Sequence, residues 1–389
     1  MHKLRAAQGV HRFFCGFALA ISLVVGLWGC ADDDPPPAVS VMGDSLSDVG
    51  TFGLKFTVQD SANPKGFPLW TQLVATGYGS DGAAQCSYFV ANQAGTQFSV
   101  NATQSCSNFA IGGGRIVAGP GQGGPSSPLN INRQMQARAS LGGFAPTELV
   151  LVDGGGNDAA DLVGAYLGAG TGAAGLSAYQ QFLLQQLDGT TVANLLTQPN
   201  GAALAAGAYM QKLAETFHGQ IVSQLLDKGA QRVVVLNVPD ISLTPRFRAV
   251  LQGVTAQAGQ QQAQLLQGAI RGWIAAFNTV IAARSGSDPR LLIVDFNATL
   301  SDIVQNFSAA RYALTDATGT ACPPTGAGPD GLPAYDFPTC TSRTLDAVPG
   351  RTAGWWKNYL FSDGFHPTPR GHELMAQAVR AQMDARGWR

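Results

Sequence analysis

Residues 38–48 read AVSVMGDSLSD, and this stretch decides the fold. Its first five residues are predicted to form a strand that ends at Gly43 and gives way to an acidic, serine-rich turn. Three later apolar runs have the same character: ELVLVD at 148–153, RVVVL at 232–236 and LLIVD at 291–295. Strands that are hydrophobic throughout are buried on both faces of a sheet, which is typical of parallel sheets covered by helices.

Helical patterns separate these strands. One apolar stripe recurs every four residues around Phe217, a second runs through a glutamine-rich segment around Ile274, and residues 368–386 read as a closing helix. We expect one α/β domain over residues 38–389, with elaborated loops. Three stretches, 119–128, 164–201 and 317–350, have no place in a minimal α/β sheet, although 164–201 reads as partly helical. Such loops tend to shape the pocket of an open sheet, but the sequence does not indicate which of them does so.

The N-terminus is predicted to be an export signal over residues 1–29. Lys3, Arg5 and Arg12 precede an uncharged run from 13 to 28, which is too short to span a membrane comfortably. The segment LWGC at 27–30 resembles a lipobox, so Cys30 is the expected lipidation site and membrane anchor, although Trp28 replaces the usual small residue. An ordinary signal peptide that contains a cysteine is the alternative. Residues 30–37 are acidic and proline-rich and read as a stiff tether. We therefore expect an outer-membrane or cell-surface lipoprotein, or otherwise a periplasmic or secreted protein.

Charge and cysteine content narrow the function further. The net charge is −1 and 13% of residues are charged, so no basic surface is expected for nucleic acid. Cys86, Cys106, Cys322 and Cys340 remain after Cys30 and the signal segment, and four cysteines allow three pairings. We expect the sequence-local pairing, Cys86–Cys106 and Cys322–Cys340. A zinc site is rejected because there is no CxxC pair and histidines are few.

Histidine scarcity allows a candidate general base to be found by elimination. Of five histidines, His2 and His11 belong to the signal segment. His218 lies in a helical pattern, and His372 begins the last helix without an acid just upstream. His366 follows Asp363 by three residues, a spacing that lets the carboxylate accept from Nδ1–H and leaves Nε2 free as a base. An Asp-x-x-His pair alone is more often structural, so this pattern needs support from other residues.

That support comes from three polar, glycine-rich segments. Ser45 follows the first strand and is expected to enter a helix, where its N–H would lie near a positive dipole end; helix capping is the alternative. NFAIGGG at 108–114 offers a backbone N–H that no side chain blocks, and GGND at 155–158 offers an amide on a strand-end loop. Both glycine runs could also be tight turns. Neither run matches a dinucleotide or phosphate loop.

Together these segments resemble the four blocks of the SGNH/GDSL hydrolases: GDSLSD at 43–48, NFAIGGG at 108–114, GGND at 155–158 and DGFHP at 363–367. The blocks occur in the family's order and bracket nearly the whole mature chain. The resemblance implies a flavodoxin-like three-layer α/β/α sandwich and a triad of Ser45, His366 and Asp363. It implies oxyanion donors at the Ser45 N–H, the Gly113 N–H and the Asn157 amide, with Gly112 as the alternative to Gly113. No cofactor or metal is expected.

The resemblance also implies the reaction, which is hydrolysis of a carboxylic ester through an acyl-enzyme. The first block, running from Gly43 to Gly50, resembles those of exported lipases and phospholipases, so lipid-type acyl esters are the expected substrates. Esters of polysaccharides or polyesters, and acyl transfer to another alcohol, would use the same residues. A non-catalytic surface-binding lipoprotein is the alternative from a different class; loss of a triad member would favour it, and none is missing. We expect a monomer.

Overall fold

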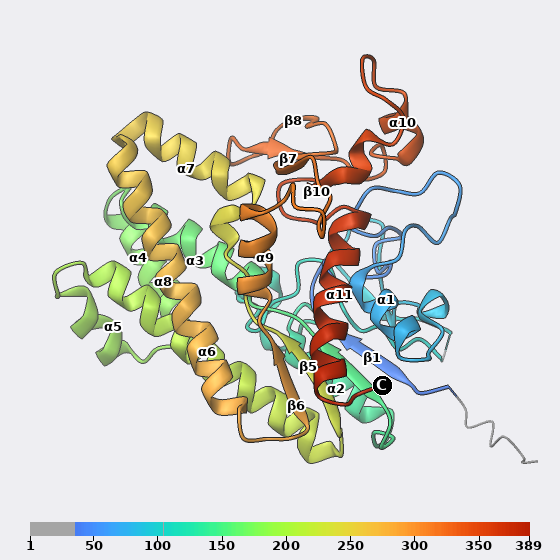
Figure 1. Ribbon diagram of the computed structural model, residues 1–389. Helices are drawn as coiled ribbons and strands as arrows, with labels where there is room; N and C mark the ends of the chain where they lie inside the picture. The colour runs from blue at the N-terminus through green and yellow to red at the C-terminus, as the bar shows by residue number, and fades with distance from the viewer. Residues whose placement is uncertain (1–35, 104) are drawn as a thin grey trace, which may run out of the picture. The chain divides into compact units, whose positions relative to one another are not determined.

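Four parallel strands form the centre of the protein in the computed structural model, which describes residues 36–103 and 105–389 (Figure 1). Their order across the sheet is β1-β4-β5-β6. Each was predicted to within a residue at either end, because each is a buried run of apolar side chains: β1 Val39–Met42, β4 Leu149–Val152, β5 Arg232–Leu236 and β6 Leu291–Val294.

An extended segment, residues 107–111, continues the sheet beyond β1. The Val41 N–H donates to the Ser107 carbonyl at 3.0 Å, and the Phe109 N–H donates to the Val41 carbonyl at 2.7 Å. The Ile111 N–H then donates to the Gly43 carbonyl at 3.2 Å. With this segment as the second element in the chain, the order becomes 2-1-3-4-5, which is that of a flavodoxin-like sheet. Two of the four blocks, at 43–48 and 108–114, therefore lie side by side at the carboxyl edge.

Helices cover both faces of the sheet, so the predicted three-layer α/β/α sandwich is confirmed. Alternate strand residues point to opposite faces. Val150, Val152 and Val235 belong to one hydrophobic core, whereas Leu151 and Val234 belong to the other. The first core is covered by α2 Ile131–Ser140, α3 Gly156–Ala169, α4 Ala173–Leu183, α5 Gly189–Leu196, α6 Gly201–Gln224, α7 Pro245–Ala258 and α8 Gln260–Ser285; the second is covered by α1 Trp70–Gly77, α9 Phe296–Gln305 and α11 Pro369–Ala385.

The two predicted apolar stripes lie on α6 and α8 and face the first core. Phe217 and Ile274 are both buried in it. The stretch 164–201, expected to be partly helical, holds the end of α3 and all of α4 and α5. The closing helix begins at Pro369, and the Thr368 side chain caps it by accepting from the Gly371 N–H at 3.2 Å.

The remaining stretches form loops and small sheets around the carboxyl edge. They include the antiparallel pairs β2 Phe89–Ala91 with β3 Phe98–Val100 and β8 Gly326–Ala327 with β9 Pro333–Ala334, the parallel pair β7 Asp316–Thr320 with β10 Tyr359–Phe361, and the short helix α10 Ser342–Asp346. Two disulfides tie these regions down, Cys86–Cys106 and Cys322–Cys340, which is the sequence-local pairing.

The predicted signal segment, residues 1–29, and Cys30 lie outside the described residues, as does most of the tether. Residues 36–389 form one compact unit. Over the described part of the chain, no helix is both long and apolar enough to cross a membrane.

Candidate active site

Ser45 lies on a tight turn directly after β1. The expected helix at this point is absent, and the first helix of the described chain is α1, which begins at Trp70. The backbone N–H groups of this turn donate to its own side chains and, in one case, to a backbone carbonyl. The Leu46 N–H donates to Asp44 Oδ1 at 2.9 Å, and the Ser47 N–H donates to the Asp44 carbonyl at 3.1 Å. Asp48 Oδ1 accepts from the Gly50 and Thr51 N–H groups at 2.9 and 2.7 Å, so no helix is needed.

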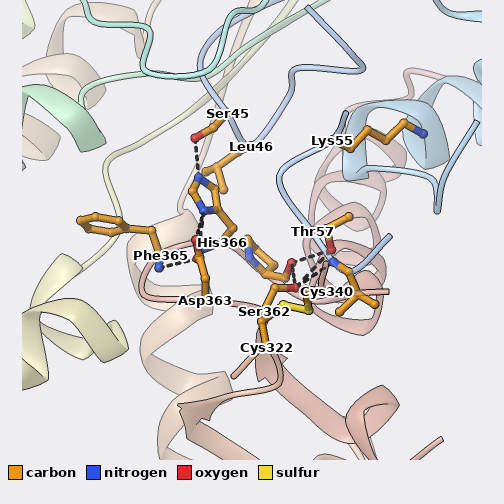
Figure 2. Close-up of polar contacts among 12 residues, drawn as sticks. Ser45, Leu46, Lys55, Thr57, Cys322, Cys340, Ser362, Asp363, Phe365 and His366 are labelled. Carbon is orange, nitrogen blue, oxygen red and sulfur yellow. Dashed lines mark hydrogen bonds and ion pairs between the residues drawn. A yellow bond between two sulfur atoms is a disulfide. The ribbon is translucent and has the colours of Figure 1, made fainter. Parts of the chain in front are cut away.

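The structure brings Ser45 together with the histidine and the aspartate from the other end of the chain (Figure 2). The Ser45 hydroxyl lies 2.8 Å from His366 Nε2. His366 Nδ1 lies 2.9 Å from each carboxylate oxygen of Asp363. The Phe365 and His366 N–H groups also donate to Asp363 Oδ1, at 2.8 and 2.7 Å, and hold this carboxylate beside the ring. This arrangement can remove a proton from the Ser45 hydroxyl and stabilise the imidazolium that forms.

The electrostatics of this pair favour a charged imidazolium. Burial alone would lower the pKa of His366, but the negative charge of Asp363, the hydrogen bond to it and the charge of Asp44 outweigh burial and raise that pKa. Burial would raise the pKa of Asp363, but the charge of His366 and the bonds it accepts lower that pKa below its usual value. Asp363 is therefore ionised when His366 acts as a base.

Aromatic rings fix the orientation of His366. Phe56 stacks on the imidazole with ring centroids 5.2 Å apart, and Phe337 meets it edge-on at 5.5 Å. Below the ring, Ser362 and Thr57 both donate to the Pro367 carbonyl at 2.9 Å and close the turn that carries the histidine (Figure 2). The ring is thus held by packing on its faces and by hydrogen bonds through its backbone.

Buried polar side chains support the turn that carries Ser45. The Gly43 N–H donates to Gln134 Oε1 at 2.8 Å, and Gln134 Nε2 donates to the Gly43 carbonyl at 3.0 Å. A Cβ on Gly43 would lie 1.9 Å from an oxygen of Asp153, so only glycine fits at this position. Burial raises the pKa of both Asp44 and Asp153, and for Asp153 the neighbouring Asp44 raises it further. These shifts favour retention of a proton by this carboxyl pair.

The glycine run at 112–114 leaves one N–H group without an acceptor among the described residues. The Gly112 N–H donates to Asp48 Oδ2 at 2.8 Å and is therefore occupied. Gly113 adopts a φ of +79°, which glycine tolerates without strain. Within residues 36–103 and 105–389, no acceptor is hydrogen-bonded to the Gly113 N–H or to the Ser45 N–H. Of the two glycines considered, Gly113 is the one whose donor remains available.

Asn157 lies in the first turn of α3 rather than in a loop. Its Nδ2 donates to the Gly114 carbonyl at 3.0 Å and to Asp44 Oδ2 at 3.3 Å. The Asn157 amide therefore bonds Gly114, the last residue of the block at 108–114, and Asp44, in the block at 43–48. The bond to Gly114 fixes the side chain, and the longer one to Asp44 is the weaker of the two.

Sequence reasoning missed four residues that hold this site: Asp48, Gln134, Phe56 and Phe337. Gln134 lies on α2 outside any motif, and no sequence signal identifies it. Asp48 belongs to the first block, where its proximity to Ser45 was the available signal. Of the other histidines in the described part of the chain, His218 lies on α6, and His372 is buried in α11, where burial lowers its pKa to about 3. Neither is hydrogen-bonded to Ser45. The described residues contain no group of three or more histidine, cysteine, aspartate or glutamate side chains arranged to hold a metal ion.

A hollow of about 460 Å³ opens beside the triad. Its walls come from the DGFHP block, from the β8–β9 hairpin and from the start of α7. Asp363, Gly364 and Phe365 form the wall nearest to the triad. An ion pair between Arg246 and Asp330 joins α7 to the hairpin across it. The hollow lies within the size range of small-molecule sites.

Comparisons with known proteins give a family and a similar solved structure. A sequence model of a family described as GDSL-like lipase/acylhydrolase matches residues 39–379. No curated protein sequence matches the chain. Among solved structures, the chain is similar to the extracellular lipase of Streptomyces rimosus, with 15% identity, a TM-score of 0.37 and coverage of 89% of this chain and 99% of that one. The family match starts at β1 and ends in α11, so it contains the whole parallel sheet and all four blocks.

Proposed function

Because the chain belongs to the GDSL-like lipase/acylhydrolase family and is thus a hydrolase acting on esters, we propose that it is a serine esterase with Ser45 as nucleophile. In this proposal His366 is the general base. Asp363 orients its imidazole ring and stabilises the imidazolium that forms. The observation that carries this proposal is the 2.8 Å distance from Ser45 Oγ to His366 Nε2, together with the 2.9 Å distances from His366 Nδ1 to Asp363.

The reaction proceeds in two half-reactions. Ser45 Oγ attacks the ester carbonyl carbon while His366 Nε2 takes the hydroxyl proton, and the tetrahedral intermediate collapses as His366 returns that proton to the departing alcohol. A water molecule then gives its proton to His366 and attacks the acyl-enzyme. Ser45 leaves with the proton from His366, and the carboxylic acid is released. Asp363 remains ionised throughout.

The negative oxygen of each tetrahedral intermediate is held by three donors in this proposal: the Ser45 N–H, the Gly113 N–H and the Asn157 amide. The first two have no acceptor among the described residues, which supports their assignment. Asn157 would exchange its longer bond, the one to Asp44, for a bond to the oxyanion while Gly114 keeps it in place. Such preorganised donors stabilise the transition state more than the substrate.

Apolar surroundings support a lipid-type acyl ester as the substrate. Phe56 packs edge-on against Phe52 and Phe337, with centroids 6.0 and 5.8 Å apart, and Phe52 meets Phe98 at 5.9 Å. This aromatic row begins at His366 and extends toward the β2–β3 hairpin. The hollow beside Phe365 adds apolar walls from prolines and an alanine of the β8–β9 hairpin. Apolar surface of this kind favours binding of a hydrocarbon chain.

A chain-length series of p-nitrophenyl esters tests the proposal on the purified soluble protein. We expect turnover that increases from acetate to a medium-length acyl chain and is lost in Ser45→Ala, while the far-ultraviolet circular dichroism of the variant matches the parent. Equal turnover by parent and Ser45→Ala would refute the serine mechanism. Turnover restricted to acetate would retain the mechanism and refute the lipid-type substrate. Product analysis with added glycerol distinguishes hydrolysis from acyl transfer.

Export to an oxidising compartment is also part of the proposal. The two disulfides support it, because such bonds persist outside the cytosol. Attachment to a membrane through a lipid on Cys30 rests on the sequence of residues 27–30.

A further inference from the structure

A second hollow, of about 340 Å³, lies between the turn after the nucleophile and the Cys86–Cys106 region. None of the triad residues lines it. It is bordered by Val49 and Gly50 on one side and by residues 83–87 on the other, with Lys55, Lys65 and Gln72 completing the wall. The mechanism above uses none of these side chains.

Lys55 is a buried cation without a carboxylate partner. Its exposed fraction is 6%, and in Figure 2 its side chain extends away from the triad. Its Nζ donates to the Phe67 carbonyl at 2.9 Å and to Gln72 Oε1 at 2.7 Å, which leaves the third N–H unassigned. In the described part of the chain, no carboxylate lies within ion-pair distance of Nζ. A buried charge without an opposite charge is costly.

A second lysine increases that cost. Lys65 lines the same hollow and donates to the Ala83 carbonyl at 3.4 Å. Burial, and then the positive charge of Lys65, lower the pKa of Lys55 to about 8. No aspartate or glutamate is among the residues that line the hollow. The local charge is therefore positive and is not neutralised by the described chain.

Further polar atoms at this hollow lack partners. Both side-chain atoms of Gln85, Oε1 and Nε2, and the Ser87 hydroxyl are buried without a hydrogen bond among the described residues. Buried polar groups normally find a partner, and an unpaired one suggests a missing ligand or water. Gln85 can donate through its side-chain amide and Ser87 through its hydroxyl. The residues that line the hollow therefore carry two neutral donors besides the two lysine ammonium groups.

From the unpaired cations and these neutral donors around one cavity, we propose that this hollow binds a phosphate-class oxyanion. Such an anion presents several strong acceptor oxygens, and lysine is a common partner for it. Its candidate donors are Lys55, Lys65, Ser87 and Gln85, which all line the hollow. The Gln85 amide and the Ser87 hydroxyl are enclosed in this structure and would turn toward the anion on binding. The proposal is independent of the esterase assignment, because none of its residues belongs to the triad or to the three oxyanion donors.

Inorganic phosphate is the first probe, titrated by calorimetry into the Ser45→Ala protein so that turnover plays no part. We expect saturable binding that weakens roughly 10- to 100-fold in Lys55→Met, the scale of one lost charge-assisted bond.

Phosphate should raise the thermal midpoint of the parent and leave that of Lys55→Met unchanged. Without phosphate, the midpoint of Lys55→Met reflects two opposing effects, the removal of an unneutralised buried charge and the loss of the bonds to Phe67 and Gln72. Lys228→Met, at an exposed lysine elsewhere, is the matched control and should bind phosphate as the parent does.

Two further variants keep the test decisive if Lys55→Met does not fold. Lys65→Met removes an exposed amine and Ser87→Ala a hydroxyl, and each should weaken phosphate binding while the protein stays folded. Flotation with vesicles of phosphatidylglycerol or phosphatidylcholine identifies the source of the anion. Retention by both vesicle types, lost in Lys55→Met, indicates a lipid phosphate, and binding of free phosphate alone indicates a soluble ligand. Absence of saturable phosphate binding, or equal affinity in the parent, Lys55→Met and Lys65→Met, would overturn the proposal and leave Lys55 as a tie between Phe67 and Gln72.

Discussion

Replacement of Asn157 by alanine tests its proposed role as an oxyanion donor, and the structure predicts two separate consequences. The first is catalytic. Loss of one preorganised donor lowers kcat by roughly 10²–10³-fold, or about 2.7–4 kcal/mol of transition-state stabilisation, with KM little changed. The second is structural, because Asn157 also donates to the Gly114 carbonyl at 3.0 Å and to Asp44 at 3.3 Å. Losing these bonds costs about 1–2 kcal/mol of folding free energy.

The loss of folding free energy lowers the melting midpoint only slightly. For a domain of this size, 1 kcal/mol shifts the midpoint by only about 1–2 °C, so Asn157→Ala should melt about 1–4 °C below the parent. Its kcat on a p-nitrophenyl ester, measured well below the midpoint, should nevertheless fall by at least 100-fold. Asn157→Asp should be at least as inactive, since it places a negative charge beside the developing oxyanion.

A matched control separates the two effects. Asn278 is another partly buried asparagine, and its side chain bonds the Val238 backbone through both its oxygen and its nitrogen, at 3.0 and 2.8 Å. Asn278→Ala should lose similar stability and keep a near-normal kcat. If Asn157→Ala behaves like Asn278→Ala, with a lowered midpoint and ordinary turnover, then Asn157 only joins the blocks and has no part in the oxyanion hole.

Other predictions follow from the same contacts. Because the charge of Asp363 raises the pKa of His366, the rate should increase with pH through a pKa above 6.5; Asp363→Asn should lower kcat by roughly 10⁴-fold and move this acid limb to lower pH, and an unmoved limb would contradict the assignment. Replacing Cys322 and Cys340 together by serine should cost about 3 kcal/mol, a loss of several degrees in the melting midpoint, and an unchanged midpoint would show that the bridge does not stabilise the fold. Cys30→Ser should release the protein from membranes in a fractionation experiment, whereas unchanged processing and release would exclude a lipid anchor.

The sheet and its helices were predictable because their signals are local. Four short apolar runs marked the strands, and the stripe through Phe217 marked a buried helix face. The pairing of His366 with Asp363 was accessible for a different reason, because histidines are scarce and one of them follows an aspartate at a spacing that suits a turn. The assignment of Ser45 to the same site came from the resemblance of the four blocks to the SGNH/GDSL hydrolases.

The supports of the site were not accessible, because they depend on partners far apart in the chain. Gln134 meets Gly43 across 91 residues, and Asp48 meets Gly112 across 64. The sequence could not decide between Gly112 and Gly113 as donor, since the choice depends on where the Asp48 carboxylate points. The predicted helix after Ser45 was wrong for a local reason, because the Asp44 and Asp48 side chains accept from N–H groups of the turn two or three residues away.

Covalent labelling most directly tests the proposal that Ser45 is the nucleophile. A fluorophosphonate probe is added to the purified protein, and the modified peptide is identified by mass spectrometry. We expect one label per chain, on Ser45, and no label on Ser45→Ala. Labelling should become faster as His366 loses its proton with rising pH. A label on any other residue, or labelling of Ser45→Ala to the same extent as the parent, would contradict the proposal.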